Sequence, residues 1–171
     1  TFHKTICVST IRSNIDRINL KELKRLEDEP ICVPAFNIYR GGNRKSASHA
    51  LKETRLLKEL QLKPNIPVML IQNLQAGRGW VNGTLAKVTE IDYENILLIK
   101  QGQEGAEDSL WIQRTSSSIA GTSYVRTQFP IVPAFATTIH KAQSITIDFV
   151  AIHLDHMHFM FNCTLQCLGC N

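Results

Sequence analysis

Four polar side chains between residues 138 and 143 could contact phosphate groups: Thr138, His140, Lys141 and Gln143. They carry a hydroxyl, an imidazole, an ammonium and an amide, and groups of this kind make many of the hydrogen bonds between proteins and nucleic-acid backbones. The chain is predicted to enter a short helix here, and the N–H groups at a helix N-terminus favour an anion. Considered alone, Thr138 is better explained as a helix N-cap and His140 as an ordinary polar residue.

Arginines and tryptophans form a second group of candidates: Arg12, Arg78, Trp80, Trp111, Arg114 and Arg126. Basic groups interleaved with aromatic rings can bind single-stranded nucleic acid through charge and base stacking. Arginine also pairs with phosphate through two parallel hydrogen bonds. Structural explanations exist as well, because Arg12 could pair with Asp16 one helical turn away, and a tryptophan in a small β-module is more often part of the core.

The charge distribution is compatible with a nucleic-acid partner but does not require one. The formal net charge is +4, and residues 1–60 contain twelve Lys or Arg against seven Asp or Glu. Residues 61–129 contain six of each. A basic amino-terminal third could contact phosphates, or it could be a solvated helix face. The composition is ordinary for a globular protein, and no apolar run approaches the roughly 20 residues that a membrane-spanning helix requires.

The five cysteines indicate a reducing compartment, because their number is odd and residues 1–10 do not resemble a secretory signal. Cys7 and Cys32 lie among apolar residues and are expected to be buried. The cysteines within residues 163–170 follow several histidines, and one Cys-x-x-Cys pair has zinc-ligand spacing. Because there is one such pair rather than two, no metal site is predicted.

Hydrophobic periodicity predicts that the chain opens as an α/β domain. Residues 5–9 form a β-branched run that is typical of a buried strand. Residues 11–26 repeat apolar side chains at the spacing of one helix face, with a capping box expected at Ser13 and Asp16. Pro30 closes this unit, because proline disfavours a helical residue before it.

The middle of the chain is predicted to form a small antiparallel β-barrel. Its short strands are separated by clusters of Gly, Asp, Asn and Ser: residues 85–88, 96–99, 110–113 and 124–129. A basic helix at 49–60 and a strand at 67–74 precede this region. After Pro133 the pattern returns to α/β, with a further buried strand at 149–154.

Several segments resemble, in the same order, the motifs of Pif/RecD-like helicases of superfamily one. Residues 138–146 resemble motif five, Ser/Thr-x-His-Lys-x-Gln-Gly-x-Thr. Residues 126–136 resemble the segment that leads into it, and residues 67–84 resemble the segment from which an SH3-like barrel departs in that family. Residues 9–19 resemble motif four. Together these ordered blocks are far more specific than a single Thr-x-His-Lys would be.

The resemblance implies two sets of site residues. Motif five would place Thr138 and His140 on the backbone of single-stranded DNA. The charge and stacking argument adds three further DNA-binding candidates, Arg78, Trp80 and Arg126.

The second set would face a nucleotide between two motor domains. It contains Arg12, which with Asn19 occupies a matching position in motif four, together with Lys141 and Gln143 of motif five. In the full-length family protein this cleft would hold ATP and Mg²⁺.

The implied fold class is α/β, a partial RecA-like second motor domain of the P-loop NTPase type interrupted by a small SH3-like antiparallel barrel. Residues 1–75 and 130–155 would belong to the motor domain and 76–129 to the barrel. Residues 156–171 diverge from the family. Codons can be chosen for residues 160–171 that, when read in a frame shifted back by one nucleotide, encode a sequence close to helicase motif six. A frame-shifted tail is therefore expected.

The implied function is that of the carboxy-terminal part of an ATP-dependent DNA helicase, which translocates on single-stranded DNA and unwinds duplexes. The 171 residues contain no G-x-x-x-x-G-K-S/T sequence, so ATP hydrolysis is expected to require the missing amino-terminal motor domain. Ser144 replaces the usual glycine of motif five, which leaves the shape of that turn open. An intracellular location is implied, nuclear or mitochondrial if the source is eukaryotic.

The sequence leaves open three alternatives to a segment of a working helicase. The chain could be a nucleic-acid-binding module without catalysis or a degenerate relic of a helicase. It could also be an interaction domain that docks a partner through the basic helix expected at 49–60.

Overall fold

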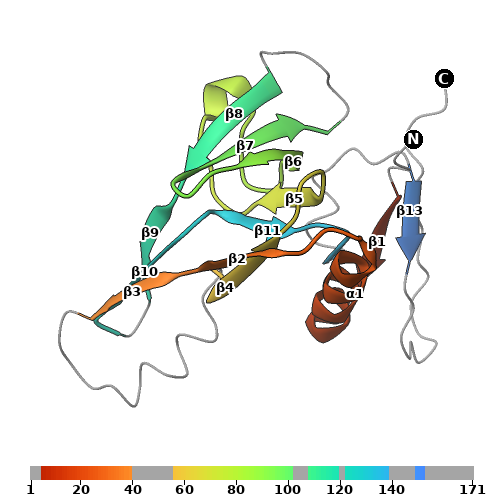
Figure 1. The fold of residues 1–171 in the computed structure, drawn as a ribbon, viewed down its shortest axis with the longest axis horizontal. Helices are drawn as coiled ribbons and strands as arrows, with labels where there is room; N and C mark the ends of the chain where they lie inside the picture. Colours follow the sequence, from red (N-terminus) through yellow and green to blue (C-terminus); the bar gives the residue numbers. More distant parts are fainter. Residues whose placement is uncertain (1–4, 40–55, 102–107, 120–121, 139–148, 153–171) are drawn as a thin grey trace.

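The computed structural model describes residues 5–39, 56–101, 108–119, 122–138 and 149–152 (Figure 1). Within these ranges β-strands predominate, and the α-helical residues lie in one segment near the amino terminus. Figure 1 shows a large β-rich part and, at one end of it, a smaller part that contains the helix and a parallel sheet.

The smaller part is a parallel sheet with a helix packed on it. β1 (Thr5–Ser9) lies between β12 (Ala136–Thr138) and β13 (Phe149–Ile152), and both neighbours run parallel to it. α1 (Arg12–Arg25) follows β1 directly and contacts both β1 and β12. The predicted opening strand and helix and the predicted late strand are therefore confirmed. The short helix expected after Thr138 falls in residues 139–148, outside the described residues.

α1 forms where apolar residues recur at helical spacing, and its inner side buries Ile15 and Leu23. The predicted capping box is wrong, because Ser13 and Asp16 lie inside the helix and Ile11 occupies the N-cap position. Ile11 has extended backbone angles and no side-chain cap. The first turn of α1 is therefore left with its N–H groups uncapped by its own side chains.

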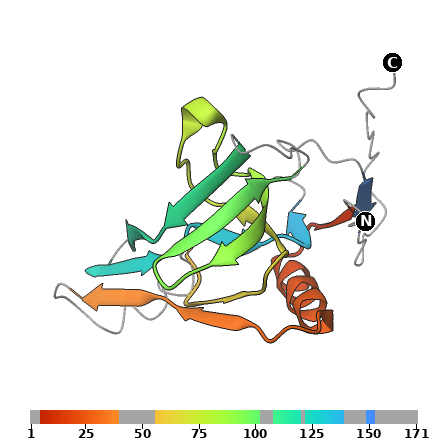
Figure 2. The ribbon, with the colours of Figure 1, turned by 45° about the horizontal axis from the view of Figure 1, so that its top comes forward.

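The β-rich part contains a five-stranded antiparallel sheet in the order β11-β5-β6-β7-β8 (Figure 2). Its strands are β5 (Pro67–Leu70), β6 (Leu85–Ile91), β7 (Asn95–Lys100), β8 (Ser109–Gln113) and β11 (Ile131–Pro133). Buried and more exposed side chains alternate along β6, β7 and β8, as expected for strands with one face on a core. The strands predicted from residue 67 to residue 113 are confirmed, although β5 is shorter than expected.

Two smaller antiparallel sheets complete the β-rich part. One pairs β2 (Ile31–Pro34) with β4 (Glu59–Leu62). The other has the order β3-β10-β9 and is built from β3 (Phe36–Tyr39), β10 (Tyr124–Gln128) and β9 (Thr115–Ser118). Of these five strands, only β10 is predicted from the sequence. β2 and β3 have partners that are distant in the chain, whereas β9 pairs with the nearby β10.

The basic helix expected at 49–60 is wrong where the structure describes it. Residues 56–58 are not helical, and Glu59 and Leu60 begin β4. Leu60 and Leu62 are both fully buried, so this segment follows the two-residue period of a strand rather than the period of a helix. Residues 49–55 lie outside the described residues.

One hydrophobic core joins these sheets and the helix. Its buried residues come from α1, β2, β4 and the five-stranded sheet, and they include Leu23, Val33, Leu62, Trp80 and Leu98. The five-stranded sheet also extends beyond residues 76–129, the range predicted for the barrel, because β5 and β11 pair within it. The five-stranded sheet therefore shares its core with α1, β2 and β4.

A buried lysine ties the end of α1 to the β-rich part. Lys63 is 3% exposed, and its Nζ donates a hydrogen bond of 2.8 Å to the carbonyl oxygen of Leu26, the C-cap residue of α1. A positive charge at this end of a helix complements the helix dipole.

Within the described residues, no helix has the length and apolarity that crossing a membrane requires.

Candidate functional site

The carboxyl ends of β1 and β12 lie side by side, at Ser9 and Thr138, where the segments predicted as motifs four and five begin. The two parallel strands pair with Cys7 opposite Ala136, Val8 opposite Thr137 and Ser9 opposite Thr138. Their last residues therefore lie side by side. In open α/β sheets, ligands bind outside the carboxyl ends of the strands. This edge of the parallel sheet is the candidate site.

A tight connection from β1 sets the start of α1 beside Thr138. Ser9 is 1% exposed, and its Oγ accepts a hydrogen bond of 3.1 Å from the backbone N–H of Ile11. The helix begins at the next residue, Arg12, which is exposed. Thr138 is half-buried, whereas Thr137 before it is 2% exposed. The edge thus offers an exposed guanidinium, a hydroxyl and the N-terminus of a helix, a set suited to anions.

Asn19 holds β12 against α1. Its Nδ2 donates a hydrogen bond of 3.2 Å to the carbonyl oxygen of Ala136, and its Oδ1 accepts one of 2.8 Å from the N–H of the same residue. Sequence reasoning placed Asn19 in motif four but gave it no role. The sequence nevertheless indicated that Asn19 faces the core, because it stands four residues from Ile15 and from Leu23 on the apolar side of the helix.

The sequence-predicted site residues divide into three groups. Arg12 and Thr138 lie at the shared strand edge. His140, Lys141 and Gln143 belong to residues 139–148, which lie outside the described residues. Arg78, Trp80 and Arg126 belong to the β-rich part.

The expected DNA contact of Arg126 is contradicted by its burial. Arg126 is 3% exposed, its Nε donates to Oδ1 of Asn37 at 2.8 Å, and its Nη1 donates to the carbonyl oxygen of Leu56 at 3.0 Å. Burial lowers the pKa of its guanidinium from the usual value. A side chain so enclosed cannot reach a phosphate outside the protein. Arg126 instead ties β3 and the segment before β4 to β10.

The expected base-stacking role of Trp80 is also contradicted, because Trp80 is 0% exposed and belongs to the hydrophobic core. One face of its ring is covered by Lys100, whose Nζ lies 5.3 Å from the ring centroid. Trp111 is the tryptophan at the surface, with 51% exposure. The alternative considered from the sequence, a core tryptophan, describes Trp80 correctly.

Arg78 remains accessible. It is exposed at the end of the short 3-10 helix η1 (Ala76–Arg78), and its guanidinium donates to Oε1 of Gln75 and to the carbonyl oxygen of Ser109, each at 3.1 Å. These contacts hold the side chain along β8.

The two cysteines in the described residues differ in accessibility, which corrects the expectation that both are buried. Cys32 is exposed on β2, whereas Cys7 is half-buried, and burial raises the pKa of the Cys7 thiol. The thiolate is the reactive form.

We therefore expect iodoacetamide at mildly alkaline pH to alkylate the exposed Cys32 roughly tenfold faster than Cys7. Mass spectrometry of the labelled peptides measures both rates, and equal rates would contradict the packing of β1.

The described residues hold no cluster of three or more His, Cys, Asp or Glu that could bind a metal ion. The cysteines and histidines weighed as zinc ligands lie in residues 153–171, outside the described residues.

The sequence matches the family described as "DNA helicase Pif1, 2B domain" over residues 55–91. It is 32% identical over 138 residues to ATP-dependent DNA helicase Pif1 of Bdellovibrio bacteriovorus, covering 79% of this chain and 30% of that protein. It is 29% identical to ATP-dependent DNA helicase PIF1 of Homo sapiens, covering 87% of this chain and 23% of that protein. Most of the chain is homologous to a part of the Pif1 helicases.

Solved Pif1 structures share the fold. The Pif1 helicase of Candida albicans superposes with a TM-score of 0.73 at 18% identity, over 88% of this chain and 39% of that one. A Bacteroides Pif1 helicase in complex with ADP-AlF3 and ssDNA gives a TM-score of 0.71 at 21% identity, over 92% of this chain and 36% of that one. The chain thus spans about a quarter to two fifths of the Pif1 proteins to which it is similar.

Proposed function

We propose that this chain is the part of an ATP-dependent DNA helicase that contacts the backbone of single-stranded DNA and forms one side of the nucleotide cleft. The observation that carries the proposal is the register of β1 and β12, which sets Thr138 beside Ser9. Ser9 stands three residues before the start of α1 at Arg12. A hydroxyl, an arginine and a helix N-terminus at one strand edge suit a phosphate ligand.

The relatives support this proposal. Those of Bdellovibrio bacteriovorus and Homo sapiens are ATP-dependent DNA helicases, and the Bacteroides structure contains both ADP-AlF3 and ssDNA. Within the proposal, Thr138 and His140 contact the DNA backbone, and Arg78 adds a contact from the β-rich part. Arg12, Lys141 and Gln143 face the nucleotide.

The residues of this chain fit one side of an ATP site. Arg12 is exposed at the start of α1, where its charge and the uncapped first turn both favour a phosphate. The chain contains no P-loop sequence, and its described residues hold no carboxylate cluster for Mg²⁺. Within the proposal, a second motor domain supplies the P-loop and the metal ligands, and that domain is the proposed partner.

We further propose that the β-rich part includes an SH3-like barrel set into a RecA-like domain. The five-stranded sheet supports a barrel that runs from about residue 67 to about residue 133. Two of its strands, β5 and β11, lie just outside the range 76–129 that was predicted for the barrel. The parallel strands β1, β12 and β13 with α1 would be the motor-domain portion.

Replacing Thr138 with valine tests the DNA contact. This change removes the hydroxyl and keeps the β-branched shape, so the strand should persist. Loss of one hydrogen bond to a charged phosphate should weaken binding of a fluorescein-labelled oligothymidylate by roughly tenfold. Fluorescence anisotropy at several salt concentrations measures the affinity, because phosphate contacts also set the salt dependence.

Thr89→Val is the matched control. Thr89 lies on β6, and its buried Oγ1 has no hydrogen-bond partner among the described residues, so its loss should leave DNA affinity unchanged. Equal affinities for both variants and the parent would overturn the proposed contact. No binding by the parent chain at low salt would overturn the proposed function itself.

Sequencing the locus around the coding region separates a helicase segment from a helicase relic. An open frame that also encodes a P-loop and motif six supports the enzyme. If the frame is limited to these 171 residues, the relic or a binding module without catalysis becomes the correct description.

A further inference from the structure

Asn19 occupies a position where an apolar residue would be expected. It stands between Ile15 and Leu23 along the buried side of α1, and both of those neighbours are buried. A polar amide on such a face is costly unless its hydrogen bonds are satisfied. The two bonds to Ala136 satisfy both its donor and its acceptor, at 3.2 Å and 2.8 Å.

The peptide groups of Ala136 that Asn19 binds face away from β1. On the β1 side, the N–H of Cys7 bonds to the carbonyl oxygen of Phe135 at 3.0 Å, so the N–H and C=O of Ala136 point toward the opposite edge of β12. There the Asn19 amide provides one donor and one acceptor, as a neighbouring strand would. β12 is therefore held from both sides, by β1 and by the side chain from α1.

We propose that Asn19 is a positioning residue for Thr138, an inference that rests on the proposed function. Thr138 follows Ala136 by two residues in β12, so the two bonds from Asn19 set the height of Thr138 relative to α1. The same rigid helix carries Arg12 two turns earlier.

Asn19→Leu in the full chain tests the assignment. Leucine has nearly the same shape and should keep α1 packed, but it breaks both bonds to Ala136. We expect a loss of oligothymidylate affinity of about fivefold with Thr138 present and little further loss in the Thr138→Val background. A thermal unfolding curve for each variant establishes that it is folded at the assay temperature.

A merely structural role would give the same loss in both backgrounds, and that result would overturn the assignment. Asn14→Leu is the matched control, because Asn14 is a half-buried asparagine on the same helix, and its Oδ1 accepts a hydrogen bond of 3.5 Å from Nη2 of Arg17 within α1. Its affinity should equal that of the parent. If Asn19→Leu does not fold, Asn19→Gln, which moves the amide outward by one methylene, takes its place in the same comparison.

The outcomes distinguish the inference from the function on which it rests. A parent chain that does not bind oligothymidylate overturns the proposed function. A parent that binds and is weakened by Thr138→Val, with an Asn19 variant that behaves alike in both backgrounds, overturns only the positioning role.

Discussion

Replacing Trp80 with alanine is expected to lower the free energy of unfolding by about 3–5 kcal/mol. Trp80 is 0% exposed and packs in the core that joins α1, β2 and the five-stranded sheet. Its loss leaves a cavity and removes the ring that Lys100 covers at 5.3 Å. Because domains of this size are commonly stable by about 5–15 kcal/mol, the variant should be close to unfolding. Urea denaturation followed by circular dichroism measures the change.

Trp111→Ala provides the control for the same residue type. Trp111 is 51% exposed on β8, so its removal should cost less than about 1 kcal/mol. The pair therefore separates a core tryptophan from a surface tryptophan in the same protein. A small loss of stability for Trp80→Ala, accompanied by weaker DNA binding, would contradict the buried position and restore the stacking role.

Replacing Arg126 with methionine is expected to destabilise the protein by about 2–3 kcal/mol. Two effects oppose each other here. Removing a buried charge relieves a desolvation cost, which also lowers the pKa of the guanidinium. Against this, the oxygens of Asn37 and Leu56 lose donors at 2.8 Å and 3.0 Å. The second effect should dominate, because the buried carbonyl oxygen of Leu56, left without this donor, carries a desolvation penalty.

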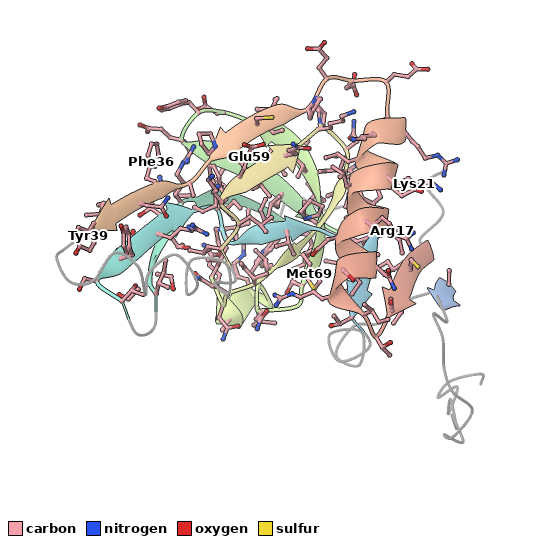
Figure 3. All side chains as sticks on the ribbon, turned by 90° about the horizontal axis from the view of Figure 1, so that it is seen from below. Arg17, Lys21, Phe36, Tyr39, Glu59 and Met69 are labelled. Carbon is pink, nitrogen blue, oxygen red and sulfur yellow. The ribbon has the colours of Figure 1, made fainter. Side chains whose placement is uncertain are left out.

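Arg17→Met is the matched control for Arg126→Met. Arg17 lies on the exposed side of α1, beside Lys21, and its Nη2 lies 3.5 Å from Oδ1 of Asn14 (Figure 3). Its replacement should change stability by no more than about 0.5 kcal/mol. Thermal unfolding compares the two variants. If Arg126→Met were as stable as the parent and bound DNA less tightly, the structural role assigned to Arg126 would be wrong.

These expectations place stability and DNA binding in different residues. Trp80 and Arg126 should affect unfolding, whereas Thr138 and Asn19 should affect affinity for single-stranded DNA at temperatures where the chain is folded. Both groups contain residues that sequence motifs alone mark as DNA-binding candidates. Measuring stability and affinity for each variant is therefore essential, since a loss of binding by Trp80→Ala could come from unfolding alone.

Local sequence patterns predicted the elements whose character is local. The β-branched run at residues 5–9 and the helical spacing of apolar residues after it became β1 and α1. Clusters of turn residues between short runs indicated β6, β7 and β8. In each case the signal comes from neighbouring residues, so it is present in the sequence before any tertiary contact forms.

The strands that sequence reasoning missed depend on distant partners. β2 pairs with β4, and β3 pairs with β10, across long stretches of chain. The segment before β4 is basic and leucine-rich, which favoured a helix. Pairing with Ile31–Pro34 and burial of Leu60 and Leu62 override that local preference.

By itself, the sequence determined the family motifs and the kinds of chemical group they contain, including Thr138 in motif five and Arg12 in motif four. Only the tertiary structure decided which of these groups meet and which are enclosed. Parallel pairing of β1 with β12 places Thr138 beside Ser9, and Asn19 reaches a partner 117 positions away. Trp80 and Arg126 are withdrawn from solvent by the common core and by strand β3. Proximity and burial arise from contacts between segments that are remote in the chain, and no local spacing records them.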